Sequence, residues 1–316
     1  MIPVMDCKFI WMNGTIVDAR QATVPFLTSG FHYGIGVFEG IRAYATSRGP
    51  AVFRLRDHLK RMEISCKILG FRELPYSIEE LSEATRQTIR ANGFDECYIR
   101  PLVWLADGGW NLTLDTGAAH IGIAVWRESV YLGHDARAQG LRANVSSFTR
   151  HHPAAVMTKA KISGNYVNSV LAKTDAHRQG FDEAILLDPE GYVAECTGAN
   201  LFIVRGDTIV TPSTESILEG VTRSTLMTLA GDLGLDAREA RISRDHLYAA
   251  DEVFVCGTAA EVLGIVDIDG RIVGTGRPGA ITTRLQQVYS DLVHGRHPRA
   301  EEWLDYVGVE SLKVRT

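Results

Sequence analysis

The stretch TKAKISGNY, residues 158–166, places two lysines two positions apart in a run of small and mostly polar residues. Lysines usually lie on the surface as solvated charges. A lysine held in a pocket can instead act as a nucleophile or as an acid–base group. The class of the protein depends on whether Lys159 or Lys161 is such a group, and the rest of the sequence provides the evidence.

The composition is that of a globular protein with a sizeable core. The chain has 316 residues, of which 45% are hydrophobic and 22% charged, and such a length suggests roughly two domains of about 100–200 residues each. A net charge of −5 gives no overall attraction to nucleic acid or to an anionic membrane. No apolar run is long enough to span a bilayer, and Asp6 and Lys8 interrupt the apolar core that a signal peptide needs.

The five cysteines are scattered, odd in number and without a CxxC pair. This usage is typical of reduced thiols in a cytoplasmic protein. It favours neither a disulfide framework nor a metal site.

The first part of the chain predicts a small α+β domain over residues 1–125, followed by an interdomain loop over 126–137. Asp57 is expected to cap the first long helix, and Ser77 with Glu80 forms a capping box before the second. Strands are expected at 9–19 (a hairpin with an Asn-Gly turn), 97–105 and 120–126, and helices at 57–70 and 77–93.

The second part, residues 138–316, predicts a larger domain that is strongly β with helices packed outside. Its β-branched runs are broken by Asp-Gly and Gly-Asp turns. Strands are expected at 183–188, 192–196, 200–212, just after Leu235, 252–256 and 262–274, and helices at 165–178, 221–233, 243–250 and, on the surface, 294–307.

GIGVFEG, residues 34–40, contains GxGxxxG and is close to a dinucleotide-binding fingerprint. That fingerprint requires a buried strand before it and a helix that opens on its last glycine. Here LTSGFHY precedes it and the β-like IRAY follows. The context therefore disfavours a nicotinamide site.

Glu195 lies in YVAECTGANLF, residues 192–202, where a carboxylate in an apolar strand is costly unless it is paired or hydrogen-bonded. A solvent-facing glutamate is the commoner explanation. The alternative is a buried acceptor for a protonated ring nitrogen.

Two features could bind phosphate. A loop with Gly220 runs into a helix whose first N–H groups, with the Thr222 hydroxyl, suit an anion. Arg61 lies one step off the apolar stripe of its helix, and its fork geometry also suits a phosphate dianion. A simple helix cap and a surface arginine are the commoner explanations.

Two further features could bind carboxylates. The alternation of strand 97–105 puts Tyr98 and Arg100 on one face. A Gly-Thr-Ala turn after strand 252–256 exposes the N–H groups of Thr258 and Ala259. A lysine, a carboxylate, a phosphate site and two carboxylate receptors together suit pyridoxal phosphate chemistry on amino acids.

In its ordered motifs the chain resembles the class IV, fold-type IV pyridoxal-phosphate aminotransferases, and most closely the branched-chain amino-acid aminotransferases. The motifs are FHYGIGVFEGIRAY (31–44), FRLRDHLKRM (53–62), YIRPL (98–102), KISGNYVNS (161–169), GYVAECTGANLF (191–202), LEGVTR (218–223) and DEVFVCGTAAEV (251–262). Each motif alone is weak, but the ordered set covers nearly the whole chain. The resemblance implies a two-domain α+β fold of fold type IV, with the cofactor in the larger domain.

The resemblance also implies the site. It selects Lys161 as the catalytic lysine, because the family's lysine stands three residues before the glycine of GNY, and leaves Lys159 as a structural or solvated neighbour. It assigns pyridoxal 5′-phosphate to Arg61, Lys161, Tyr166, Glu195, Gly220, Val221, Thr222 and Thr258. It assigns the substrate to Tyr33, Phe38, Tyr98, Arg100, Trp126, Tyr131, Thr258 and Ala259.

Several of these residues have specific roles in the family. Glu195 falls where the pyridine nitrogen is held, and Tyr166 beside the phenolic oxygen. Arg100 matches the group that takes the distal carboxylate of glutamate, and Tyr33 is lent by the partner subunit. Glu219 stands in the turn before Gly220, where some relatives carry proline.

The function expected from the resemblance is transfer of the amino group of L-leucine, L-isoleucine or L-valine to 2-oxoglutarate by a ping-pong mechanism, in a cytoplasmic homodimer or larger homo-oligomer. Alternatives with the same fold are a D-amino-acid or (R)-amine transaminase and an aminodeoxychorismate lyase. Alternatives of other classes are an NAD-dependent dehydrogenase that uses GIGVFEG and a non-catalytic binding module.

Overall fold

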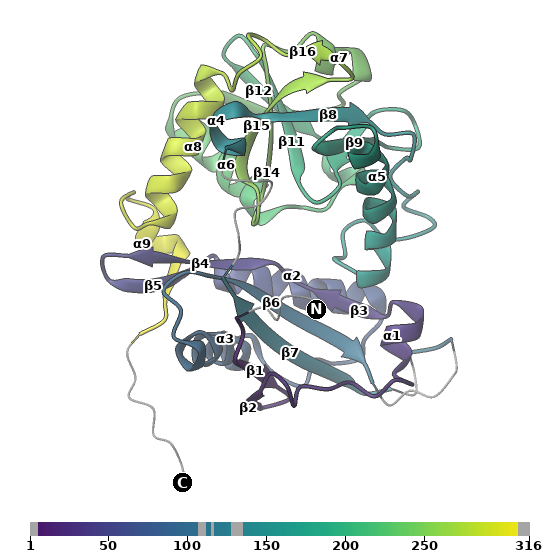
Figure 1. The fold of residues 1–316 in the computed structure, drawn as a ribbon, viewed down its shortest axis with the longest axis vertical. Helices are drawn as coiled ribbons and strands as arrows, with labels where there is room; N and C mark the ends of the chain where they lie inside the picture. The colour runs from purple at the N-terminus through teal and green to yellow at the C-terminus, as the bar shows by residue number, and fades with distance from the viewer. Residues whose placement is uncertain (1–5, 107–111, 115–116, 128–134, 309–316) are drawn as a thin grey trace.

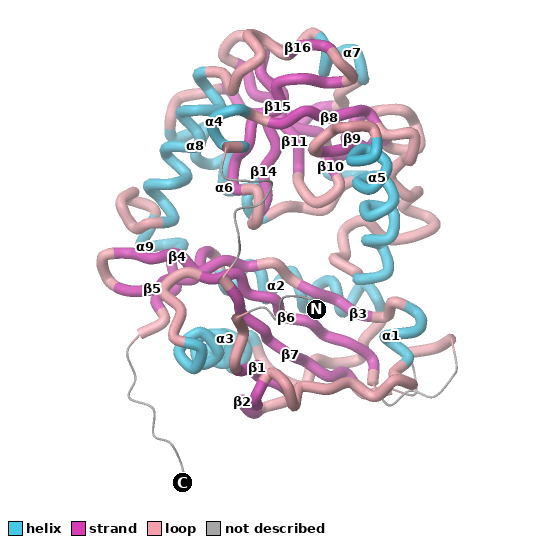
Figure 2. The backbone as a smooth tube through the Cα atoms, in the orientation of Figure 1, coloured by secondary structure: helices cyan, strands magenta, loops and turns pink. Residues whose placement is uncertain are grey.

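The computed structural model describes residues 6–106, 112–114, 117–127 and 135–308. Its elements form two β-sheets with helices packed against them, one sheet above the other (Figure 1). Figure 2 shows the strands of both sheets in magenta and the helices in cyan around them. The mixed α+β fold predicted from the sequence is confirmed.

The first sheet has the strand order β17-β5-β4-β6-β7-β1-β2, with β3 beside β6, and its neighbours all pair antiparallel. Its strands are β1 (Phe9–Met12), β2 (Thr15–Asp18), β3 (Gly36–Phe38), β4 (Ile41–Thr46), β5 (Gly49–Phe53), β6 (Cys97–Leu105), β7 (Ala119–Trp126) and β17 (Leu304–Tyr306). The predicted hairpin is present, and Asn13 and Gly14 both take positive φ in its turn.

Three helices belong to this part: α1 (Ser29–Tyr33), α2 (Leu55–Leu69) and α3 (Ile78–Asn92). The Ser77–Glu80 capping box of α3 is confirmed. The expected cap of α2 at Asp57 is wrong, because the chain turns at Arg54, with φ of 50°, and helix begins at once. Asp57 therefore lies in the first turn of α2, where it accepts a hydrogen bond from Arg54 Nε at 2.7 Å.

The apolar stripe of α2 packs into the core of the first sheet. Leu59, Met62 and Cys66 form this stripe and are buried together with Ile99 and Ile121 of the sheet. This packing fixes the rotation of the helix about its axis, so that Arg61, beside the stripe, lines the space between the two sheets.

The second sheet has the order β10-β9-β8-β15-β14-β11-β12-β13, with β16 beside β15. Its strands are β8 (Leu141–Val145), β9 (Glu183–Leu187), β10 (Val193–Cys196), β11 (Asn200–Arg205), β12 (Thr208–Pro212), β13 (Asp236–Ala240), β14 (Glu252–Gly257), β15 (Glu261–Ile268) and β16 (Arg271–Ile272). The remaining helices are α4 (Ala136–Gln139), α5 (Tyr166–Arg178), α6 (Val221–Asp232), α7 (Arg244–Tyr248) and α8 (Ala280–Val293), and α9 (Ala300–Trp303), which lies beside β5 of the first sheet; 3-10 turns lie at Ser163–Asn165 and Thr214–Ser216. Figure 1 shows α5 and α8 on opposite flanks of this sheet.

The two sheets share one apolar cluster. Tyr44 and Phe53 of the first sheet lie in it with Phe202 and Phe254 of the second, whose rings stack with centroids 4.9 Å apart, and with Tyr289 of α8. The shared cluster holds the two sheets in a fixed relation, and the site described below lies between them.

The C-terminal part of the described chain returns to the first sheet. The expected surface helix over 294–307 is wrong, because only Ala300–Trp303 is helical within that range and β17 then pairs with β5. The long helix of this region is α8, which was not predicted and ends at Val293, before the predicted range begins. Trp303 and Leu304 are buried, and the Trp303 ring lies 6.3 Å from that of Phe53. The apolar side chains at 303–304 fill the end of the shared cluster, which a solvent-facing helix would leave open.

Within the described ranges, no helix combines the length and the apolar character needed to cross a membrane. All five cysteines lie in those ranges and are free thiols.

Candidate active site

The two lysines of the opening stretch face different sides because the chain turns between them. In a regular strand, residues two positions apart share a face, but residues 158–160 form a turn, and Ile162 N–H donates to the Ala160 carbonyl at 3.0 Å. After the turn, Ile162 bridges Val37 of β3, and Lys161 N–H donates to Ser65 Oγ at 3.0 Å. Lys161 enters the pocket between the sheets, and Lys159 lines a separate hollow beside the loop before α6.

Lys159 has structural partners there. Its Nζ lies 2.8 Å from Glu219 Oε1 and also donates to the Thr214 carbonyl. Both partners belong to the loop that leads into α6. Lys159 thus ties the 158–162 segment to that loop from outside the pocket, which accounts for the second lysine.

The pocket between the sheets collects most of the predicted residues. Its described lining comprises Gly40, Arg61, Tyr98, Arg150, Lys161, Tyr166, Ser169, Glu195, Cys196, Thr197, Gly198, Ala199, Asn200, Leu218, Gly220, Val221, Thr222, Cys256, Gly257, Thr258 and Ala259. All eight residues predicted to bind the cofactor are among them, as are the predicted substrate residues Tyr98 and Ala259. These residues come from α2, β6, α5, β10, α6 and the β14–β15 turn, so neither sheet could form the pocket alone.

Lys161 and Tyr166 face each other inside the pocket. Lys161 Nζ donates to Tyr166 Oη at 2.6 Å. Phe38 closes this end, because its ring centroid lies 4.7 Å from that of Tyr166 and 5.0 Å from Lys161 Nζ. The Lys161 amine therefore lies inside the pocket, hydrogen-bonded to the Tyr166 hydroxyl and in contact with the rings of Phe38 and Tyr166.

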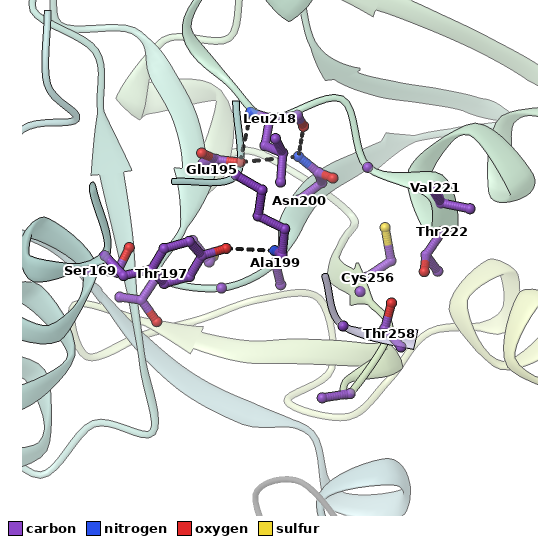
Figure 3. Close-up of a pocket in the computed structure, with 18 of the residues that line it drawn as sticks. Ser169, Glu195, Thr197, Ala199, Asn200, Leu218, Val221, Thr222, Cys256 and Thr258 are labelled. Carbon is purple, nitrogen blue, oxygen red and sulfur yellow. Dashed lines mark hydrogen bonds between the residues drawn. The ribbon is translucent and has the colours of Figure 1, made fainter. Parts of the chain in front are cut away.

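Glu195 is buried, as its functional interpretation requires. Its Oε1 lies 2.8 Å from Arg150 Nε, and its Oε2 accepts from Asn200 Nδ2 at 3.2 Å and from Leu218 N–H at 3.3 Å (Figure 3). Burial raises the pKa of the Glu195 carboxyl, and the positive charge of Arg150 opposes this shift only in part. A further N–H donor or positive charge at this carboxylate would therefore stabilise its ionised form.

The start of α6 and Arg61 form one anion-binding region. α6 begins at Val221 after Gly220, and no side chain caps it, so the first N–H groups are open to the pocket. A Cβ on Gly220 would lie 2.0 Å from Asn200 Oδ1, so a side chain there would displace the amide that hydrogen-bonds to Glu195. Arg61 lies beside this turn and donates from Nη1 to the Glu219 carbonyl at 2.8 Å.

Thr258 and Ala259, in the turn between β14 and β15, line the pocket. Tyr98 faces it from β6 and packs against Gly40, where a Cβ would lie 2.0 Å from Tyr98 Oη. A hydroxyl and backbone N–H groups converging in this way can bind a carboxylate.

Arg100 lies in an aromatic surround beyond Tyr98. Its guanidinium carbon is 4.7 Å from the Phe38 ring centroid and 5.7 Å from that of Trp126, and its Nη2 donates to Tyr98 Oη at 3.3 Å. Its Nε is buried and has no hydrogen-bond partner among the described residues. Arg100 therefore has a hydrogen-bond donor, Nε–H, that no described residue uses and that lies next to apolar rings.

Of the predicted substrate residues, Phe38, Arg100 and Trp126 lie beside the pocket, next to Tyr98 and Tyr166, and are not among the described residues that line it. Two others are not seen in this arrangement. Tyr33 lies on α1 with 40% of its surface exposed and is not among the described residues that line the pocket of its own chain. Tyr131 lies outside the described residues.

Sequence reasoning missed Arg150, Asn200 and Glu39. Arg150 and Asn200 hold Glu195, and no local pattern marks them. Glu39 was detectable, because it is a carboxylate inside the apolar run GIGVFEGIRAY, which is the same signal that singled out Glu195. The structure buries Glu39 completely against Arg61 and His58.

The dinucleotide alternative lacks its structural context. GIGVFEG follows the short helix α1 and contains the strand β3, and β4 begins directly after it. A dinucleotide fingerprint joins a strand to a helix at this place, so the disfavoured nicotinamide site is not supported.

Comparison with known proteins agrees with this geometry. The amino-transferase class IV family profile matches residues 36–268. The branched-chain-amino-acid aminotransferase of Pseudomonas aeruginosa is 47% identical over 93% of this chain and 95% of its own. The crystal structure of the Escherichia coli branched-chain amino acid aminotransferase matches with a TM-score of 0.93 and 42% identity over 96% of this chain and 100% of that one.

A third relative was solved in its pyridoxal-phosphate form. The holo form of the branched-chain amino acid aminotransferase from Thermobaculum terrenum matches with a TM-score of 0.90 and 35% identity over 96% of this chain and 99% of that one. The family profile spans more than half of the chain, and the relatives cover nearly all of it. The chain therefore belongs to the class IV aminotransferases, the fold-type IV family that its ordered motifs resemble.

Proposed function

We propose that this protein is a branched-chain amino-acid transaminase that transfers the amino group of L-leucine, L-isoleucine or L-valine to 2-oxoglutarate with pyridoxal 5′-phosphate as its cofactor. The observation that carries the proposal is the convergence of the Lys161 amine, the buried Glu195 carboxylate and an anion site on one pocket. The identity of 47% to the P. aeruginosa enzyme supports the substrate class, and the pyridoxal-phosphate form of the T. terrenum structure supports the cofactor.

The pocket residues fit this cofactor. Arg61 and the open N–H groups of Val221 and Thr222 suit its phosphate, and Gly220 keeps the approach free. Glu195, which lacks a fully compensating cation, suits its ring nitrogen. Tyr166 lies 2.6 Å from Lys161 Nζ, where its hydroxyl suits the phenolic oxygen beside the aldehyde.

When bound, pyridoxal phosphate supplies a ring that accepts the electron pair released as the amino acid loses its Cα proton. Lys161 Nζ takes that proton and later returns one, first as a base and then as an acid. Tyr166 Oη holds the amine in place. Glu195 keeps a proton on the ring nitrogen, which preserves the electron demand of the ring.

Substrate recognition divides between two regions. Tyr98 and the backbone at Thr258 and Ala259 suit the α-carboxylate, which both substrates share. Arg100, within its aromatic surround, suits the distal carboxylate of glutamate, while the rings of Phe38 and Trp126 suit an aliphatic side chain. One pocket can then serve both halves of a ping-pong cycle.

We further propose that a second copy of the chain covers α1 and α5 and lends Tyr33 to this pocket. Large apolar side chains on and beside these helices are exposed: Phe26 by 73%, Phe31 by 71%, Val167 by 61% and Val170 by 60%. Such a surface is costly in water unless a partner covers it.

We propose that the chain divides into a small domain, residues 1–125, an interdomain loop, residues 126–137, and a large domain, residues 138–316. The strand β17 follows the large domain in the chain but pairs with the sheet of the small one.

We also expect a cytoplasmic location, because all five cysteines are free thiols.

The visible spectrum of the purified protein tests the function. We expect a yellow absorption band that L-leucine bleaches and 2-oxoglutarate restores, because the two substrates load and unload the amino group. Bleaching by D-alanine alone would move the function to the D-specific transaminases. Absence of a band after addition of pyridoxal phosphate would refute the cofactor, and a band without turnover would indicate a binding module.

Lys161→Ala should lower transaminase activity by at least about 10²–10⁴-fold, the range for removal of a positioned acid–base group. Lys159→Ala serves as the matched control and should retain activity, because Lys159 faces Glu219 outside the pocket. Borohydride reduction followed by peptide mapping should label Lys161. Labelling of Lys159 would overturn the assignment.

Arg100→Leu should raise KM for glutamate far more than KM for leucine, because only glutamate brings a second carboxylate. Steady-state kinetics with each amino donor measures the difference. Arg127→Leu, which removes an arginine whose side chain is 69% exposed, should change neither value. Equal losses for both donors would contradict dual recognition by Arg100.

Sedimentation equilibrium should give at least twice the chain mass of 34.8 kDa. Val170→Glu on α5 should shift the mass towards the monomer, because it places a charge in the proposed interface. Ile272→Glu, at a site 63% exposed on β16, is the control and should not. A monomeric wild-type protein would refute the interface.

A further inference from the structure

A buried carboxylate that the reaction does not use lies behind the anion site. Glu39, between β3 and β4, has no exposed surface. Its Oε1 accepts from Arg61 Nε at 2.7 Å, and its Oε2 accepts from Arg61 Nη2 at 2.7 Å and lies 2.8 Å from His58 Nδ1. A buried charge persists only when it is paired in this way.

Arg61 is held at three of its five N–H groups. A guanidinium carries one N–H on Nε and two on each Nη. Glu39 takes the Nε hydrogen and one Nη2 hydrogen, and the Glu219 carbonyl takes one Nη1 hydrogen at 2.8 Å. No described residue accepts the second N–H of either Nη, and Arg61 lines the pocket beside Gly220 and Val221.

We propose that Glu39 is a positioning residue that fixes Arg61 so that its two remaining N–H groups meet the phosphate of the cofactor. The inference rests on the proposed function, because it takes pyridoxal phosphate as the ligand. Glu39 itself does not touch the pocket, whose described lining includes Arg61 but not Glu39. Its effect on the ligand must therefore pass through the arginine.

The ionisation of the three groups agrees with this role. Burial alone raises the pKa of the Glu39 carboxyl, but the charge of Arg61 and the hydrogen bonds from Arg61 and His58 outweigh it and hold the pKa well below its usual range. Burial lowers the pKa of His58, which favours the neutral ring, and a hydrogen on Nδ1 would face the Glu39 carboxylate. The cluster then contains one anion and one cation.

Because Glu39 is negatively charged, its replacement distinguishes two explanations: positioning of Arg61 by Glu39, and a simple effect of net charge on phosphate binding. Glu39→Gln removes a negative charge next to a site for a phosphate dianion. If net charge governed binding, the variant would bind phosphate more tightly. If Glu39 positions Arg61, the variant binds phosphate more weakly. A neutral amide accepts at one oxygen only, so it cannot accept from Arg61 Nε and Nη2 together and no longer fixes the guanidinium.

The test measures affinity of the apoenzyme for pyridoxal phosphate and for pyridoxal, which lacks the phosphate, by quenching of tryptophan fluorescence. We expect Glu39→Gln to raise Kd for pyridoxal phosphate about 10–100-fold, as in sites where a partner that orients a ligand is removed. Kd for pyridoxal should change by less than about twofold, because its binding does not use Arg61. A purely structural role of Glu39 would weaken both ligands alike.

Matched variants complete the design. Asp269→Asn is the control, because Asp269 also accepts from three groups, Val145 N–H, Arg244 and Tyr248, and lies outside the pocket lining. It should leave both affinities unchanged. In the background of Arg61→Met, Glu39→Gln should have no further effect on pyridoxal phosphate, since the pair acts as one unit.

The outcomes are distinct. Equal weakening of both ligands, unchanged affinities or tighter binding of pyridoxal phosphate in Glu39→Gln would overturn the positioning role. If that variant does not fold, Glu39→Asp replaces it, because the aspartate keeps the buried charge but has a shorter side chain. Kd for pyridoxal phosphate should again rise while Kd for pyridoxal stays unchanged. A wild-type apoenzyme that does not prefer pyridoxal phosphate to pyridoxal would instead refute the proposed cofactor.

Discussion

The pairing of two buried carboxylates with two arginines fixes the walls of the pocket. Glu39 holds Arg61 on the side of the first sheet, and Glu195 holds Arg150 on the side of the second. An unpaired charge at either position would cost several kcal/mol, so each pair constrains both its members. Because Arg61 also binds the carbonyl of Glu219, the first constraint extends across the gap to the loop before α6.

The site exists only where the two sheets meet, so the contacts between them are part of its construction. The shared apolar cluster packs the two sheets together, and Arg42 adds an ion pair between them. From β4, Arg42 lies 3.1 Å from Glu96 and 3.2 Å from Glu261. Glu261 follows the turn that carries Thr258 and Ala259 and has φ of 52°, an angle that few side chains adopt. Its ion pair with Arg42 joins the end of this turn to the first sheet.

The local signals in the sequence predicted the capping box and those strands and helices whose patterns lie within one stretch of chain, such as β6, β14, α3 and α6. They did not predict the strand β8 or the helix α8. The tail over 303–306 was mistaken because Leu304 pairs with Phe53, and pairing at that range leaves no local pattern. Lys161 could be told from Lys159 only through family resemblance; the physical difference is the turn between them, which only the folded chain reveals. Arg150 was missed for a similar reason, because its role depends on its distance from Glu195.

The two carboxylates share a residue type and a degree of burial, but their ionisation equilibria shift in opposite directions. Glu39 has both oxygens on a bidentate arginine and a histidine, so its negative charge is compensated and its pKa falls. Glu195 has one arginine contact and two neutral donors, so burial prevails and its pKa rises. Glu39 already has a compensating cation in Arg61, whereas the ionised form of Glu195 would be stabilised by a further one. This difference supports the proposal that Glu39 holds the protein's own arginine, whereas Glu195 receives the protonated ring nitrogen of the cofactor.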